Sequence, residues 1–175
     1  GVPPSIYKPY TVSPDIIAKR RLQIKEGYFH SVNNTVIPDY SALVTDSRPL
    51  VAGLTDLVQK SVENNGLTHR ETIELIMAFC QDIPYGVPPN QYKGKVISGM
   101  FPPPLSLNKT WGDCDTKALL FASIYLSIPG ASMVLLESPG HISVGIEGIP
   151  RPYDNAVSYG GKKFIFAEPV GPGKH

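Results

Sequence analysis

The chain has 175 residues, of which 42% are hydrophobic, so it is long enough for one sizeable core and a single domain is the expected organisation. Its 16 basic and 15 acidic residues leave a formal net charge of +1, which gives no global electrostatic basis for binding nucleic acid or an anionic membrane. No apolar run approaches the length of a membrane span. We therefore expect no nucleic-acid partner and no membrane span.

The two ends of the chain carry the weakest patterns. Residues 1–46 show no sustained hydrophobic period and are interpreted as an N-terminal arm, and residues 171–175 as a tail or the start of a linker. Because the chain begins at Gly1 and not at Met, we expect that a segment preceded it. An extracytoplasmic location, periplasmic or secreted, is favoured on that ground.

Two helices are predicted between residues 47 and 83. Ser47 is the expected N-cap of the first, which ends at Asn65-Gly66. Its apolar side consists of Leu50, Val51, Leu54, Leu57, Val58 and Val62. Thr68 and Glu71 form a capping box at the start of the second helix. The apolar face of that helix consists of Ile73, Ile76, Met77 and Cys80, so Cys80 is interpreted as structural.

A further helix is predicted with Cys114 in its first turn and Asp113 as its N-cap. The helix dipole favours the thiolate there, but it contributes only about 0.3–1 kcal/mol at an exposed site, whereas one pKa unit corresponds to about 1.4 kcal/mol. Asp113 and Asp115 oppose it. A nucleophilic Cys114 therefore needs a cation from elsewhere in the chain, and an imidazolium is the simplest choice.

Beyond Gly130 the hydrophobic period changes to that of strands, predicted at 131–137 and 141–147 and in a second hairpin at 156–159 and 163–168. His141 opens its strand on the polar face. Glu168 shares a face with two phenylalanines, where an unpaired carboxylate would be costly.

Three residues of this second half form a candidate catalytic set. Cys114, His141 and Glu168 follow one another at intervals of 27 residues and supply a nucleophile, a base and an orienting carboxylate. The Cys114 backbone N–H and the Gln81 side chain are the expected oxyanion donors. Trp111, beside the thiol in sequence, is the expected cleft wall.

Four segments resemble the transglutaminase-like superfamily of bacterial and archaeal proteins: residues 79–85, 112–118, 140–144 and 167–169. The Gly-Asp-Cys-Asp-Thr-Lys-Ala run at 112–118 is the most specific of them. The resemblance covers roughly residues 47–170, interpreted as the catalytic domain. It implies an α+β fold with a papain-like core, a helical N-terminal half, and the cysteine helix packed on an antiparallel sheet that carries the other two residues.

One position departs from the superfamily pattern, whose third member is usually aspartate where this chain has Glu168 before a proline. Asp154 is the competing carboxylate, but its surroundings, Pro152-Tyr153-Asp154-Asn155, are more simply interpreted as a turn.

The resemblance implies a cysteine-dependent acyl-transfer enzyme that acts on peptide or carboxamide bonds of a protein or peptide substrate through a thioester. Hydrolysis, as a protease or amidase, is favoured over cross-linking, and deamidation stays open. No cofactor and no metal is expected, since the sequence has no CxxC, no HExxH and no His/Cys cluster at ligand spacing. The alternative is a catalytically silent binding or assembly module of the same fold. Substrate identity and oligomeric state stay open.

Overall fold

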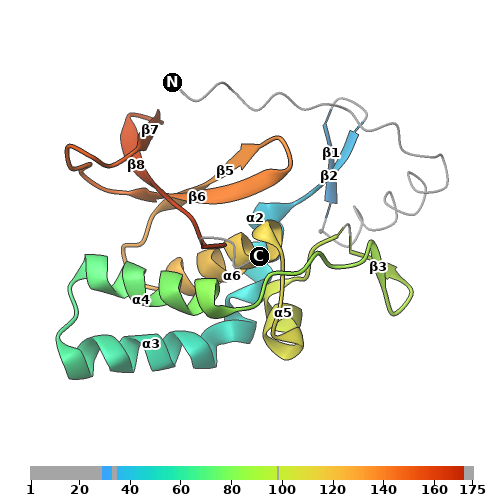
Figure 1. The fold of residues 1–175 in the computed structure, drawn as a ribbon, viewed down its shortest axis with the longest axis horizontal. Helices are drawn as coiled ribbons and strands as arrows, with labels where there is room; N and C mark the ends of the chain where they lie inside the picture. The colour runs from blue at the N-terminus through green and yellow to red at the C-terminus, as the bar shows by residue number, and fades with distance from the viewer. Residues whose placement is uncertain (1–28, 33–34, 98, 172–175) are drawn as a thin grey trace.

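The structure, a computed structural model, describes residues 29–32, 35–97 and 99–171. Within them the chain is of the α+β class, with five α-helices and a curled antiparallel sheet of four strands. The sheet lies across one side of helices α4 and α6, and α3 lies outside α4 (Figure 1). The predicted α+β class is therefore confirmed.

The first half of the described chain is mainly helical. Its elements are β1 (Phe29–Val32), β2 (Thr35–Pro38), α2 (Tyr40–Ser47), the 3-10 turn η1 (Pro49–Val51), α3 (Ala52–Asn65), α4 (His69–Asp82), β3 (Gln91–Tyr92), β4 (Lys95–Val96) and α5 (Pro103–Lys109). The second half consists of α6 (Cys114–Tyr125), β5 (Met133–Ser138), β6 (His141–Glu147), β7 (Ala156–Tyr159) and β8 (Lys162–Ala167). None of the helices in the described part of the chain is long and apolar enough to span a membrane.

The prediction of a helix that begins at Ser47 is wrong. The structure has one helix that ends at this residue, α2, and a second that begins after it, α3. Asp39 is the N-cap of α2, where its carboxylate accepts a hydrogen bond from Ala42 N–H at 2.9 Å, and Ser47 is the last residue of that helix. Pro49 then begins η1, because the fixed φ of proline suits the first position of a helical turn. The helix that ends at Gly66, as predicted, begins only at Ala52.

The expected boundary between residues 46 and 47 falls inside α2. Leu43 and Val44 of this helix are buried in one cluster with Leu119 and Ala122 of α6. Residues 40–46 therefore contribute to the core. Residues 1–28 of the expected arm and residues 172–175 of the expected tail lie outside the described residues.

The segment made of η1 and α3 buries a narrower stripe than its sequence pattern predicts. Val51 of η1 and Val58 of α3 are buried, but Leu50 of η1 and Leu57 of α3 are 70% and 62% exposed. The prediction for these two leucines is wrong because η1 and α3 form an outer segment, and α3 packs against neighbours on one side only (Figure 1).

The caps of α4 and α6 and the inner face of α4 are as predicted. Thr68 and Glu71 form a complete capping box, and Ile76 and Cys80 are fully buried. In α6 eleven of the twelve residues are buried, so this helix is covered on all sides. It packs on the sheet through a core cluster that includes Phe121, Ile142 and Val144.

The sheet has the strand order β5-β6-β8-β7, so the two predicted hairpins are joined through β6 and β8. In that antiparallel pair Val144 lies opposite Ala167. Since β6 begins at His141 and β8 ends at Ala167, the start of β6 and the end of β8 lie side by side at the same end of the strands. This pairing brings His141 and Glu168 together.

Candidate active site

The loop before α6 places Cys114 at the first position of the helix. Asp113 is the N-cap, as predicted, and its carboxylate accepts a hydrogen bond from Thr116 N–H at 3.1 Å. A side chain at Gly112 would come within 2.3 Å of the Thr116 methyl carbon, so only glycine allows the chain to approach the helix this closely. Gly112 N–H also donates to Pro84 C=O at 3.1 Å, which fixes this loop to the segment after α4.

The Cys114 thiol is almost buried, with 8% of the residue exposed. It donates a hydrogen bond to Asp115 Oδ1 at 3.3 Å, and Asp115 Oδ2 accepts one from Tyr40 O–H at 3.0 Å. The pKa of the thiol is raised to about 11, mainly by burial and also by the charge of Asp115, while the Ile142 backbone N–H acts to lower it. In this arrangement Cys114 is a neutral thiol at pH 7.

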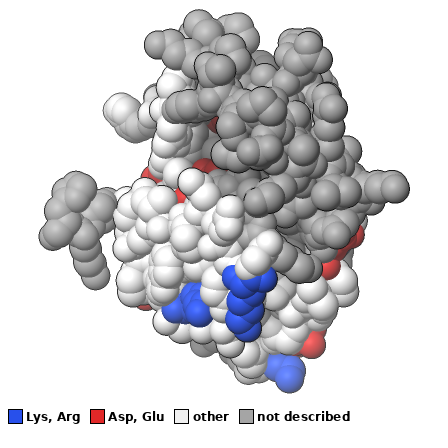
Figure 2. Space-filling view, turned by 90° about the vertical axis from the view of Figure 1, so that its right-hand side faces the viewer, with Lys and Arg blue, Asp and Glu red and all other residues white. Residues whose placement is uncertain are grey.

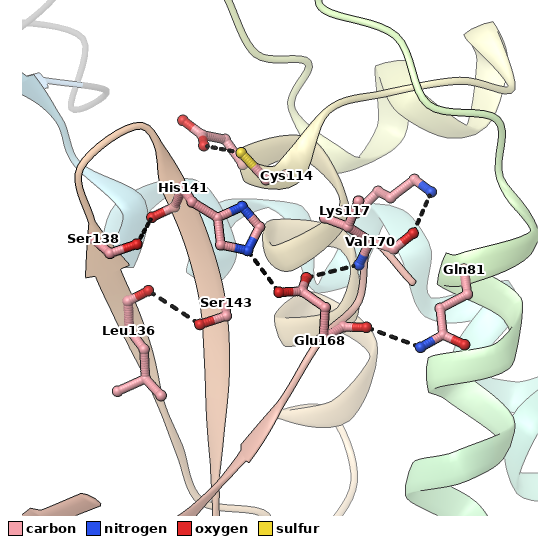
Figure 3. Close-up of polar contacts among 10 residues, drawn as sticks. Gln81, Cys114, Lys117, Leu136, Ser138, His141, Ser143, Glu168 and Val170 are labelled. Carbon is pink, nitrogen blue, oxygen red and sulfur yellow. Dashed lines mark hydrogen bonds and ion pairs between the residues drawn. The ribbon is translucent and has the colours of Figure 1, made fainter. Parts of the chain in front are cut away.

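His141 and Glu168 form the closest polar pair of the site. His141 Nε2 lies 2.6 Å from Glu168 Oε2, and both side chains are partly exposed. A carboxylate can only accept hydrogen bonds, so Nε2 is assigned as the donor and Nδ1 as the nitrogen with the free lone pair. In Figure 3 the imidazole lies between Cys114 and Glu168, with its second nitrogen turned toward the sulfur.

Glu168 is fixed by the segment that follows β8. Its Oε1 accepts a hydrogen bond from Val170 N–H at 3.0 Å, while Lys117 Nζ donates to Val170 C=O at 3.4 Å. Lys117 is only 1% exposed, and its desolvation lowers the pKa of the ammonium group, an effect that the charges of Asp82 and Glu168 oppose. A buried cation of α6 therefore holds the chain that carries the carboxylate.

The Gln81 side chain helps to hold Glu168 in place. Its Nε2 donates to Glu168 C=O at 2.9 Å, and the close-up shows Lys117 and Glu168 between this amide and Cys114 (Figure 3). Its predicted part as an oxyanion donor stays a prediction. The Cys114 N–H is in the first turn of α6, where backbone donors have no partner within the helix, so it is available to an oxyanion.

Trp111 is half-buried beside the start of α6. Its ring meets that of Phe101 edge-on, with the centroids 4.7 Å apart. The Phe101 N–H in turn donates to Thr116 Oγ1 on α6 at 2.9 Å. A side chain at Gly86 would come within 2.8 Å of the indole, so this glycine makes room for the ring. The tryptophan is thus in a fixed position three residues from the thiol.

Asp154, the competing carboxylate, lies in a turn, where its Oδ2 accepts a hydrogen bond from Arg151 N–H at 2.9 Å. The structure therefore brings together Cys114, His141 and Glu168 and engages Asp154 elsewhere.

The contacts of Tyr40 and Lys117 were not predicted. Helix α6 is apolar around its whole circumference, which indicates burial on all sides, and a lysine within it is then expected to be buried too. That pattern could have identified Lys117 from the sequence. Tyr40 gives no such signal, since its partner Asp115 is 75 residues away.

A cavity of about 470 Å³ lies between α2, α6 and β5, apart from the three candidate catalytic residues. Tyr40, Ala122 and Leu135 contribute to its lining, whereas Cys114, His141 and Glu168 do not. Among the described residues, no group of three His, Cys, Asp or Glu side chains could hold a metal ion.

No protein-family model matches the chain, and neither a curated protein nor a solved structure does. The function must therefore be argued from the site itself.

Proposed function

We propose that this protein is a cysteine-dependent acyl-transfer enzyme that acts on peptide or carboxamide bonds. The observation that carries the proposal is the 2.6 Å contact between His141 Nε2 and Glu168 Oε2, with the imidazole lying between that carboxylate and the Cys114 thiol (Figure 3). A base that is oriented by a carboxylate and faces a thiol is the arrangement that nucleophilic catalysis needs.

The reaction then follows from the protonation states. As Cys114 Sγ attacks the substrate carbonyl carbon, its proton passes to His141 Nδ1, and the carbonyl oxygen becomes an oxyanion bound by the Cys114 N–H. Glu168 stabilises the imidazolium, which gives its proton to the departing amine as the C–N bond breaks. The resulting thioester is cleaved by water, which regenerates the thiol, or by another amine.

The sequence resemblance to the transglutaminase-like superfamily agrees with this chemistry. A papain-like core has its cysteine at the N-terminus of a helix that packs on an antiparallel sheet, and here Cys114 begins α6, which packs on β6. Hydrolysis, as a protease or amidase, is the favoured outcome because uncharacterised bacterial members of the superfamily resemble proteases and amidases more often than cross-linkers.

The test is to incubate the protein with a mixture of peptides and carboxamides, with and without a primary amine, and to identify products by mass spectrometry. We expect hydrolysis that Cys114→Ser abolishes and Glu168→Gln lowers by at least about a hundredfold, the range of general acid–base catalysis. Amine incorporation that outpaces hydrolysis would make the protein a cross-linking enzyme. Turnover that persists in Cys114→Ser would refute the proposal.

The second candidate is a catalytically silent binding or assembly module. It is favoured by the hydrogen bond from the thiol to Asp115, because that contact and the raised pKa keep Cys114 protonated. Under this alternative, His141→Ala leaves the alkylation rate of Cys114 unchanged at every pH. Under the enzyme proposal the same change lowers the rate, because the thiol loses its base.

A further inference from the structure

A row of aromatic rings leads away from the candidate active site. Trp111 contacts Phe101, whose centroid lies 6.1 Å from that of Tyr92 at the end of β3. Since an extended chain advances about 3.3 Å per residue, Tyr92 lies within roughly three residues of a peptide that passes Trp111. Phe101 is buried, so only Trp111 and Tyr92 at the two ends are partly exposed to a substrate, and the distance between them is that of a short peptide segment.

Two lysines lie over the far end of this row. Lys109 Nζ is 4.9 Å and Lys93 Nζ is 5.6 Å from the centroid of the Tyr92 ring. Neither lysine forms an ion pair with the part of the chain that the structure describes. Figure 2 shows the side of the molecule that carries β3, where basic side chains lie near one another, with described acidic side chains at the right of the view.

The backbone at Lys93 is strained. Lys93 has φ +49° and is followed by Gly94 at φ +76°, so both central residues of the β3–β4 turn have positive φ. That turn favours Asn-Gly, because asparagine tolerates positive φ better than lysine does. Among the described non-glycine residues, positive φ occurs only at Lys93 and at Thr110, the left-handed C-cap of α5 directly after Lys109. At Thr110 this conformation is an ordinary helix end, so the strain applies to Lys93.

We propose that Lys93, Lys109 and Tyr92 form a subsite for a carboxylate of the substrate. The two ammonium groups lie 4.9 and 5.6 Å from the centroid of the same ring, and a carboxylate bound near both of them relieves the repulsion between their charges. The inference rests on the proposed function and gives it a substrate class, namely acidic peptides that carry a carboxylate about three residues from the part of the peptide that passes Trp111. The carboxylate comes from a Glu or Asp side chain or from a peptide C-terminus.

The experiment compares three peptides that differ at one place. The first has Glu three residues from the cleaved amide, the second has Gln there, and the third has Gln and ends there with a free carboxylate. The Glu position is also moved from two to four residues away, on either side of the amide. We expect kcat/KM to be roughly fivefold higher for the Glu peptide than for the Gln peptide, mainly through KM, and to lose this preference at high salt.

Three variants test which residues are responsible. Lys93→Gln and Lys109→Gln should each lower the preference for Glu, whereas Lys60→Gln, an exposed lysine on α3, should leave it unchanged. Lys93→Asn relieves the positive φ and should fold at least as well as the wild type while also losing the preference. A stronger gain for the third peptide than for the first would assign the subsite to a C-terminal carboxylate.

The failure of this inference can be told apart from the failure of the proposed function. Equal turnover of the Glu and Gln peptides, dependent on Cys114, would overturn the subsite and keep the enzyme. If no peptide is turned over, the subsite is tested by measuring the affinity of the fluorescently labelled Glu and Gln peptides for the Cys114→Ser protein. Tighter binding of the Glu peptide that is lost in Lys93→Gln supports the subsite, and equal binding of the two peptides overturns it.

Discussion

At the scale of single residues, Asp115 is the side chain with the most direct effect on the thiol. It accepts the Cys114 hydrogen bond at 3.3 Å, and its charge adds to the increase in the thiol pKa. Asp115→Asn should therefore lower the pKa of Cys114 and raise its alkylation rate at pH 8. A fall of about one unit gives roughly a tenfold larger thiolate fraction. Because burial is the largest cause of the raised value, the pKa should stay above that of a free thiol.

The measurement is the rate of iodoacetamide labelling of each cysteine against pH, followed by mass spectrometry. Cys80 is the internal control, since burial raises its pKa to about 12 and it is fully covered. Tyr40→Phe should act in the opposite sense to Asp115→Asn, because an Asp115 that loses the Tyr40 bond is freer to accept from the thiol. An unchanged labelling profile in Asp115→Asn would mean that the 3.3 Å contact has no influence on the thiol.

The members of the candidate site differ in how far the sequence could predict them. Cys114 and His141 are recognisable because an N-cap, a helical period and a strand alternation each give a local signal. Turn chemistry favours Glu168 over Asp154, and the contact of Glu168 with His141 agrees with this prediction. The direction of the Gln81 side chain was not predictable, because its partner, the Glu168 carbonyl, is 87 residues away.

At the scale of the elements, the segment after α4 determines where the Trp111 ring lies. Gly86→Ala would place a methyl group 2.8 Å from the indole, so we expect the ring to move out of its contact with Phe101. Trp111 is the only tryptophan of the chain, so the intrinsic fluorescence should shift to the red as the indole becomes more exposed to water. We expect kcat/KM to fall by about tenfold, since small displacements beside reacting groups are costly.

Gly53 provides the matched control for this change. It lies within α3, and a side chain there would meet nothing within 4 Å. Gly53→Ala should leave the fluorescence and the turnover unchanged and raise the free energy of unfolding by about 0.5–1 kcal/mol. If Gly86→Ala also leaves the fluorescence unchanged, the position of the indole does not depend on this glycine.

The predicted helix boundaries succeeded where a local cap defines them. The Thr68–Glu71 capping box and the left-handed Gly66 are both present as predicted. The start at Ser47 failed because a serine before an apolar run resembles an N-cap, although the chain is already helical from Tyr40. Asp39 gives α2 a cap of its own, but the residues around Ser47 do not distinguish the two cases, since α2 is also stabilised by its contact with Leu119 and Ala122, far along the chain.

At the scale of the whole molecule, the two hairpins were predictable, but the way in which they join was not. Turn residues and alternation define β5–β6 and β7–β8 locally. The pairing of β6 with β8 joins residues about twenty positions apart and depends on the packing of both strands over α6. That pairing, which no local pattern encodes, is what brings His141 to Glu168.

Although the side chain of Lys117 helps to position Glu168, its buried charge lowers the stability of the folded protein. Desolvation lowers its pKa, so the folded chain binds its proton less tightly than the unfolded chain does, and the charged ammonium group opposes folding at neutral pH. This cost should diminish as the pH rises through the lowered pKa, where the folded protein loses the proton first. Lys117→Met, which fills the same space without a charge, should therefore raise the free energy of unfolding at pH 7 by about 1 kcal/mol.

The same substitution should lower activity. Without the Lys117 contact to Val170 C=O, the segment that holds Glu168 is less well fixed, so kcat should fall by about tenfold with little change in KM. Thr55→Val, which changes a buried hydroxyl on α3, should leave kcat unchanged and serves as the control. A Lys117→Met protein that is more stable and equally active would show that β8 and the Gln81 contact alone position the carboxylate.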